Sequence, residues 1–339
     1  MAARRLVFAI SGVLAVLGLA LPAATSWSSW QTRPVTEGRP VATVEGERNP
    51  LDVTWIRSVE AALVDRLAGV GLAARLDGAI TRAVFDRTGR SSVIVGDGDL
   101  FLRDDLASRC PAELSVRREL DAVDALAAAA AADGARLVAM VIPDKSAATP
   151  DALPGPFEGA AACARDRVRA VEAALVDHDG VDAVALTDLL LAADRYQGDD
   201  THWNAAGRTA AQERLVDVLV PGAWRSSWVV PGPETFVPDL LGLLGDRRSR
   251  TVPGSHLDLD IPVDFEVVVD GGLPTVHHRA EPGEAAATAP VPGHTLVVHD
   301  SFVNQRRQEF ASLFAEVTMV HWEALDDAVA AGVFDADYD

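Results

Sequence analysis

The chain has 339 residues, with 30 Lys and Arg against 50 Asp and Glu, and a formal net charge of −20. Hydrophobic residues make up 49% of it, which excludes a wholly disordered chain and leaves ample material for the core of one large or two medium domains. The acidic balance argues against nucleic acid as a partner, because phosphate-binding surfaces are built from clustered Lys and Arg.

The N-terminus carries an apolar run from Leu6 to Leu21, preceded by Arg4 and Arg5. The run is short for a spanning helix, which needs about 20 residues, so both a signal anchor and a cleaved signal peptide fit. Both interpretations place the rest of the chain outside the cytoplasm, since the positive charges stay inside. We expect residues 1–26 to be the signal or membrane anchor, 27–52 a linker and 53–339 one domain.

The rest of the chain alternates between helical and extended patterns. Apolar spacing predicts a helix from Val53 to about Val84, and a hairpin follows with its turn at Gly96 to Asp99. An Ala-rich helix is expected from Pro111 to Ala132. Further helices are predicted at 165–176, 188–195, 205–219 and 302–314, and strands at 136–142, 181–186, 265–269, 295–298 and 317–321. Residues 220–262 are rich in Pro, Gly and Arg and predict an irregular excursion.

This order predicts an α/β fold, flavodoxin-like, with a mostly parallel sheet and helices on both faces. The two cysteines, Cys110 and Cys163, form an even pair in a chain expected to be exported, so one disulfide is predicted, with two buried thiols as the alternative. The pairs His277-His278 and Asp258-x-Asp260 are not spaced like a metal site in combination, and both are interpreted as surface. No metal or other cofactor is expected.

Two short segments carry the residue types of a nucleophilic relay. Asp200-Thr-His202 stands in a loop before a helix, and Ser301 stands where a predicted strand runs into a helix. A Ser at such a turn is presented at the carboxyl edge of the sheet, where the helix N–H groups can stabilise an oxyanion. Asp200 would orient His202, and His202 would take the Ser301 proton. Each motif alone also fits a purely structural role: a loop His bonded to a carboxylate, or a helix cap before Ser301.

Four other residues near the two motifs or the predicted sheet edge give weaker evidence for a catalytic or binding role. His299 is an alternative base only if its strand stays regular, and Asp300 fits a turn residue that bonds the backbone better than a triad member. Lys145 lies near the sheet edge and could bind substrate, although a solvated surface Lys fits as well. Trp203 could stack on a sugar, although packing fits equally.

The motifs and their order resemble the AlgX/AlgJ family of SGNH hydrolase-like polysaccharide O-acetyltransferases. The resemblance is carried by Asp200-Thr-His-Trp-Asn204, Val297-Val-His-Asp-Ser-Phe302, the Val95 to Phe101 hairpin, Val141-Ile-Pro-Asp-Lys145 and Pro238-Asp-Leu-Leu-Gly-Leu-Leu-Gly245. It covers roughly residues 85–325. The chain departs from the family pattern at His299, where Gly is usual, and at Asp99, where Trp is usual.

The resemblance implies an extracytoplasmic enzyme in which Ser301 takes an acetyl group and passes it to a polysaccharide hydroxyl. It also implies a membrane O-acyltransferase as the donor's source. Two alternatives stay open: an acetyl-esterase with the same triad, and a non-catalytic glycan-binding or assembly protein on the same fold.

Overall fold

The computed structural model describes residues 93–107, 113–191, 194–244, 246, 248–270, 273–280, 289–335 and 338. The predicted anchor (1–26), the linker (27–52), the helix from Val53 to Val84 and Cys110 lie outside these ranges. Within the described ranges, no helix has both the length and the apolar character needed to cross a membrane.

The chain divides into two units, of which the larger consists of Ser91–Leu241 and Arg247–Asp339. The smaller consists of Met1–Arg90 and Gly242–Asp246, and only residues 242–244 and 246 of it are described. The larger unit carries every candidate site residue, and its fold is built from the elements that follow.

The first half of the larger unit is close to the sequence prediction. The hairpin forms from β1 (Val93–Val95) and β2 (Leu100–Leu102), and the Ala-rich helix is α5 (Glu113–Ala132). The Ala-rich helix is followed by Gly134 with a φ of 76°, a left-handed conformation that favours glycine. The next elements are β3 (Leu137–Met140), α6 (Lys145–Ala148), α7 (Gly155–Val176), β4 (Val181–Val184) and α8 (Thr187–Leu191). Helix α7 begins ten residues earlier than predicted, at a Gly-Pro pair whose Pro156 suits a first helical turn.

The second half begins with α9 (Ala205–Leu219), which has the predicted bounds. The predicted irregular excursion is wrong in part, because it holds a regular antiparallel pair, β5 (Val229–Phe236) and β6 (Arg250–Leu257), with α10 (Asp239–Leu243) between them. The last elements are β7 (Glu266–Val269), β8 (Thr275–Arg279), β9 (Val291–His299), α12 (Ser301–Asn304), α13 (Arg307–Ala311), β10 (Phe314–His321) and α14 (Leu325–Ala330).

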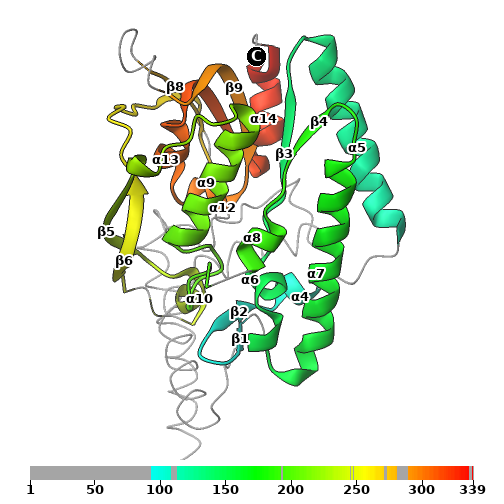
Figure 1. The fold of residues 1–339 in the computed structure, drawn as a ribbon, viewed down its shortest axis with the longest axis vertical. Coiled ribbons are helices and arrows are strands. Elements are labelled where there is room, and N and C mark those ends of the chain that lie inside the picture. The colour runs from blue at the N-terminus through cyan, green and yellow to red at the C-terminus, as the bar shows by residue number, and fades with distance from the viewer. Residues whose placement is uncertain are drawn as a thin grey trace, which may run out of the picture. The chain divides into compact units, whose positions relative to one another are not determined.

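The α/β content is confirmed, but a mostly parallel sheet is wrong for the described strands. Parallel pairing joins β3 with β4 and β9 with β10, as predicted. The largest sheet has the order β7-β8-β10-β9, and its other two pairings are antiparallel because β8, which the sequence analysis missed, follows β7 through a short connection. Figure 1 shows α5 and α7 lying beside β3 and β4.

The core spans both parts of this arrangement. It includes Leu186 and Leu190 beside β4, Phe310 in α13 and Val317 and Met319 in β10, all 2% exposed or less. Between β3 and β9 lies a cavity of about 610 Å³ lined largely by apolar side chains, among them Met140 and Val297. The two parallel pairs therefore contribute to one core without forming a continuous hydrogen-bonded sheet.

Lys145 at the start of α6 is a structural residue, which corrects its prediction as a substrate-binding or solvated surface residue. Its side chain is 1% exposed, and its ammonium group donates to the carbonyls of Leu100 at 3.0 Å, Gln197 at 2.5 Å and Gly198 at 2.8 Å. Burial lowers the pKa of Lys145, while the carboxylate of Asp99, 3.7 Å away, opposes that shift. The three donors are all taken, so Lys145 ties the hairpin to the loop that carries Asp200 and His202.

Replacing Lys145 should therefore destabilise the fold more than replacing an exposed cation. Lys145→Met removes a buried charge that is fully bonded and takes a donor from three carbonyls, of which Gly198 keeps the Leu100 N–H at 2.7 Å, so we expect the free energy of unfolding to fall by about 3 kcal/mol. Arg169→Met is the matched control, because Arg169 forms an exposed ion pair with Asp188 and should change stability by less than about 0.5 kcal/mol. Equal losses in denaturant unfolding would contradict the structural role.

Cys163 in α7 is disulfide-bonded, while Cys110, the other cysteine of the chain, lies outside the described residues. The Cys110–Cys163 pairing therefore stays a prediction. A loop of about 50 residues closed in this way stabilises a fold by about 4 kcal/mol on the chain-entropy view. We expect Cys163→Ser, Cys110→Ser and the double variant to lower the unfolding free energy equally, because each breaks the same bond. Two titratable thiols in unreduced, denatured wild-type protein would contradict the pairing.

Candidate active site

The loop from Gly198 to Asn204 presents the candidate base at the start of α9. The side chain of Asn204 caps this helix by accepting from the Gly207 N–H at 3.0 Å. A single antiparallel bridge between Tyr196 and Trp203 closes the other end of the loop. The loop is thus fixed on both sides, which holds His202 in one position.

Asp200 and His202 form the predicted pair. The Nδ1 atom of His202 lies 2.6 Å from Oδ1 of Asp200, and the same oxygen accepts the His202 backbone N–H at 2.9 Å. The other oxygen of Asp200 accepts the Asp239 backbone N–H at 2.9 Å. Burial alone would raise the pKa of Asp200, but the hydrogen bonds and the charge of His202 hold that pKa below its ordinary value. Asp200 is therefore a buried carboxylate that fixes the imidazole with Nδ1 as donor.

Asp239 is a residue whose role the sequence analysis missed. Its carboxylate accepts the Thr201 backbone N–H at 2.9 Å and the Thr201 hydroxyl, and one of its oxygens lies 3.7 Å from His202 Nδ1. Asp239 belongs to the Pro238 to Gly245 segment that carries part of the family resemblance, but the sequence of that segment does not indicate that Asp239 lies beside His202. The ligand atoms of Asp200, His202 and Asp239 also lie near enough to one another to hold a cation.

Carboxyl groups dominate the electrostatics around His202. Burial would lower the pKa of His202, but its hydrogen bond to Asp200 and the charges of Asp200, Asp239 and Asp300 raise that pKa above the ordinary value. Two further carboxyls have raised pKa values. Burial together with Asp144 and Asp239 raises the pKa of Asp105 to about 8, and burial with Asp300 raises the pKa of Asp144 to about 6. The sequence analysis assigned no role to either residue: Asp105 lies in the short helix α4 (Asp104–Ala107), and Asp144 directly precedes α6.

Ser301 occupies the predicted strand-to-helix turn as the first residue of α12, directly after β9. Asp300 is the helix cap and accepts the Phe302 N–H at 2.9 Å, as the turn interpretation predicted. The ring of Phe302 packs edge-on against the imidazole of His202, with centroids 5.0 Å apart. The residue that follows Ser301 in the chain therefore packs against His202.

The Nε2 atom of His202 is buried and has no hydrogen-bond partner among the described residues, so Ser301 Oγ is not bonded to it in this conformation. Catalytic hydrogen bonds are often long in the absence of substrate. The imidazole nitrogen that would accept a proton therefore has no partner among the described residues, and its ring packs against Phe302, the residue after Ser301.

His299 has a different environment from His202. Its Nδ1 lies 2.9 Å from the Asp300 carbonyl oxygen, and its ring packs edge-on against His321 with centroids 5.5 Å apart. Burial, together with the positive charges of His321 and Arg307, lowers the pKa of His299 to about 4. No carboxylate in the described structure orients this imidazole as Asp200 orients His202, which favours His202 as the base.

Trp203 is a core residue, which corrects its prediction as a sugar-stacking residue. It is 1% exposed, stacks on Phe310 with centroids 6.1 Å apart and meets Phe302 edge-on at 5.3 Å. Trp203 therefore supports the site indirectly, because it packs against Phe302 and Phe302 packs against His202.

Residues 93–224 match a protein family described as "SGNH hydrolase-like domain, acetyltransferase AlgX". The matched range includes Asp200 and His202 and ends before Ser301. No curated protein sequence matches the chain.

Among solved structures, the chain is similar to Bacillus cereus PatB1 with a sulfonyl adduct, at 10% identity and a TM-score of 0.52, over 71% of this chain and 90% of that one. It is also similar to the O-acetyltransferase domain of Pseudomonas putida AlgJ (14% identity, TM-score 0.43, 74% of this chain and 88% of that one) and to Pseudomonas aeruginosa AlgX (16%, 0.43, 74% and 58%). At these identities the likeness concerns the fold alone. Of the three structures, PatB1 with the sulfonyl adduct has a TM-score above 0.5 and supports the shared fold.

The resemblance that the motifs indicate is therefore confirmed as a match of residues 93–224 to the family described as SGNH hydrolase-like domain, acetyltransferase AlgX.

Proposed function

We propose that the chain is an O-acetyltransferase that moves an acetyl group through Ser301 onto a hydroxyl of an exported or cell-surface polysaccharide. The observation that carries this proposal is the Asp200–His202 hydrogen bond of 2.6 Å, in an imidazole whose other nitrogen is buried without a partner among the described residues and whose ring packs against Phe302, the residue after Ser301. The family match over residues 93–224 supports acetyl transfer as the reaction class.

In the first half-reaction, Ser301 Oγ attacks the carbonyl carbon of an acetyl ester while His202 Nε2 takes the hydroxyl proton. Asp200 stabilises the resulting imidazolium, because its carboxylate is already bonded to Nδ1. The Ser301 backbone N–H, at the start of α12, would be a donor to the tetrahedral oxyanion, since the Phe302 N–H is taken by Asp300. The carbon–oxygen bond of the donor then breaks, its oxygen receives the proton from His202, and acetyl-Ser301 remains.

In the second half-reaction, His202 Nε2 takes the proton of an acceptor hydroxyl, and that oxygen attacks the acetyl carbonyl. The ester bond to Ser301 breaks, Oγ recovers the proton from His202, and the acetylated sugar leaves. The esterase alternative differs in one respect, because water replaces the sugar hydroxyl in this step. Water exclusion from the cleft decides between the two outcomes.

A partition experiment separates these alternatives. The full chain is incubated with an activated acetyl ester and a series of polysaccharides, and acetylated sugar is measured against free acetate. The transferase proposal requires that a suitable acceptor diverts acetyl groups from water to sugar. An unchanged yield of free acetate with every acceptor would support the esterase, and no ester cleavage at all would support a non-catalytic glycan-binding or assembly protein.

An extracytoplasmic location is part of the proposal. Disulfides persist in oxidising compartments, and Cys163 is disulfide-bonded. The apolar run from Leu6 to Leu21 would direct export and would serve as an anchor if it is not cleaved. A donor on that side of the membrane requires a partner that carries acetyl groups across, such as a membrane O-acyltransferase. No nucleic-acid partner is proposed, given the net charge of −20.

Removing the nucleophile should remove activity without unfolding the protein. We expect Ser301→Ala, His202→Ala and Asp200→Ala each to lower the cleavage of an activated acetyl ester by about a thousandfold, with little further loss in the triple variant. Mass spectrometry of acid-quenched wild type should find the acetyl group on the peptide that contains Ser301. Ser312→Ala is the matched control, because the Ser312 hydroxyl bonds only the Glu309 carbonyl in α13. Full activity in Ser301→Ala would contradict the mechanism.

The activity should rise with pH through a single ionisation of His202. The neutral imidazole is the active form, and the pKa of His202 is raised, so the acidic limb should lie above the ordinary value of about 6.5. Asp239→Asn removes one of the charges that raise this pKa, so the limb should move to lower pH.

His299→Gly is the control for this assignment. The pKa of His299 is lowered to about 4, so its loss should leave a limb above pH 6.5 in place. If the limb vanished in His299→Gly while activity remained, His299 would be the base. A limb unmoved in Asp239→Asn would contradict the electrostatic account of His202.

A further inference from the structure

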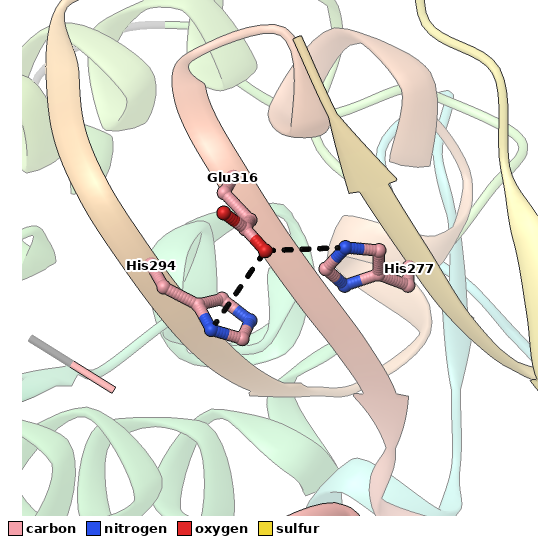
Figure 2. Close-up of side chains that lie close together, drawn as sticks. All are labelled: His277, His294 and Glu316. Atoms are coloured by element: carbon pink, nitrogen blue, oxygen red, sulfur yellow. Dashed lines mark ion pairs between the residues drawn. The ribbon is translucent and has the colours of Figure 1, made fainter. Parts of the chain in front are cut away.

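Three strands bring two imidazoles and a carboxylate together at the opposite end of β9 from Ser301. His277 lies on β8, His294 on β9 and Glu316 on β10, and Figure 2 shows the two imidazoles on either side of the carboxylate. Strand pairing accounts for the cluster: Glu316 is directly opposite His294, and His277 is directly opposite Thr318, two residues along β10. The three ligand-bearing residues are all partly buried.

The spacing of the three side chains suits one small cation. Oε1 of Glu316 lies 3.4 Å from Nε2 of His277 and 4.0 Å from Nδ1 of His294. One ligand atom from each residue can be chosen so that all lie within 4.8 Å of one another. Tetrahedral zinc with bonds of about 2.0–2.2 Å places its ligand atoms about 3.3 Å apart, so a small closure of His294 toward Glu316 completes three positions.

Thr318 sets which imidazole nitrogens face the carboxylate. Its Oγ1 lies 3.0 Å from Nδ1 of His277 and 3.1 Å from Nε2 of His294. Thr318 is also hydrogen-bonded to Tyr338, whose own hydroxyl donates to the Val333 carbonyl at 2.6 Å. Thr318 therefore donates to Tyr338 and accepts from both imidazoles.

This network gives each neutral imidazole a lone pair on the side of Glu316, at His277 Nε2 and His294 Nδ1. These lone pairs and the Glu316 Oε1 atom, which also accepts from Arg279, face a common point where a proton or a metal ion would offset their mutual repulsion. Metal-ligating histidines generally donate their other N–H to a fixed acceptor, and Thr318 is such an acceptor for both rings.

Other charges face the cluster from the same strands. Arg279, opposite Glu316, forms an ion pair with its carboxylate, but the Arg279 side chain is 65% exposed and can turn to solvent at little cost. Glu266 on β7 lies opposite His277 and adds a further negative charge. The local environment therefore accommodates a divalent cation.

We propose that His277, His294 and Glu316 form a binding site for a divalent transition-metal ion of the zinc class, with Thr318 as the positioning residue and a solvent molecule in the fourth position. Two imidazoles and one carboxylate suit such ions better than Ca²⁺ or Mg²⁺, which prefer all-oxygen ligands. His277, which the sequence analysis interpreted as a surface residue, is partly buried. Its neighbour His278 is also not on the surface, being 2% exposed.

The proposed metal would act as a clamp on the sheet and would take no part in acetyl transfer. His294 precedes Ser301 by seven residues along an extended strand, which corresponds to about 20 Å. The bound ion would join β8, β9 and β10, and Thr318 and Tyr338 would connect it to the Val333 carbonyl. The proposal is independent of the proposed function.

The test uses the full chain after removal of metal with a chelator and dialysis. Titration with Co²⁺ should give the intense visible absorption of a four-coordinate ion, at one ion per chain, and Zn²⁺ should abolish that absorption. Zn²⁺ should also raise the melting temperature of the wild type, because it binds the folded state. His277→Gln, His294→Gln and Glu316→Gln should each weaken binding at least about tenfold, and Thr318→Val about 10–100-fold.

Two control variants locate the binding. His256→Gln changes an exposed histidine on β6 and should bind as the wild type does, with circular dichroism confirming that every variant is folded. His202→Gln removes the other cluster that could hold an ion and should also leave the cobalt spectrum unchanged. A wild type without four-coordinate cobalt absorption would show that a proton alone occupies the cluster. Binding that survives in His294→Gln, or that is lost in His202→Gln, would likewise overturn the proposal.

Discussion

The Asp200 carboxylate is the interaction on which the rest of the site depends. It is 1% exposed and accepts three N–H groups: the His202 backbone, the His202 ring and the Asp239 backbone. No Lys or Arg pairs with it in the described structure, so these donors alone offset the cost of burying its charge. Because two donors come from one loop and the third from α10, the position of the imidazole depends on both segments being in place.

Lys145 holds the first of those segments. Its ammonium group binds the carbonyls of Gln197 and Gly198, directly before Asp200, and a third carbonyl in the β1–β2 hairpin. The hairpin has no catalytic group, yet it is one of the segments that carry the family resemblance. The structure gives a physical reason for its presence, because the hairpin is one anchor of the loop that presents His202. A buried Lys with carbonyl partners makes this connection without placing a competing cation against Asp200.

Sequence reasoning succeeded where local chemistry decides the structure. The hairpin turn, the end of α5 before Gly134 and both ends of α9 follow from turn residues, caps and apolar spacing, and the Asp200–His202 pair follows from a two-residue spacing in a loop. It failed where burial and distant pairing decide. Lys145 and Trp203 have side chains that fit a surface or a core equally well, and only the packed structure distinguishes the two.

The same limit applies to the sheet. Strand β8 carries two consecutive histidines and an arginine, so its sequence does not resemble a buried strand, and without it the antiparallel half of the sheet could not be predicted. The His277, His294 and Glu316 cluster was missed for the same reason, because its members come from three strands that are adjacent only in the folded chain.

The two candidate bases, His299 and His202, show why the role of a residue cannot be assigned from its distance along the chain. His299 is two residues from Ser301, but burial, with smaller contributions from His321 and Arg307, lowers its pKa to about 4. His202 is far away in sequence, but carboxylates surround it and raise its pKa despite burial. A general base must accept a proton and hold it through a transition state, which a carboxylate partner favours and a cationic neighbour opposes. The charges around each ring therefore favour the proposed assignment of His202 as the base.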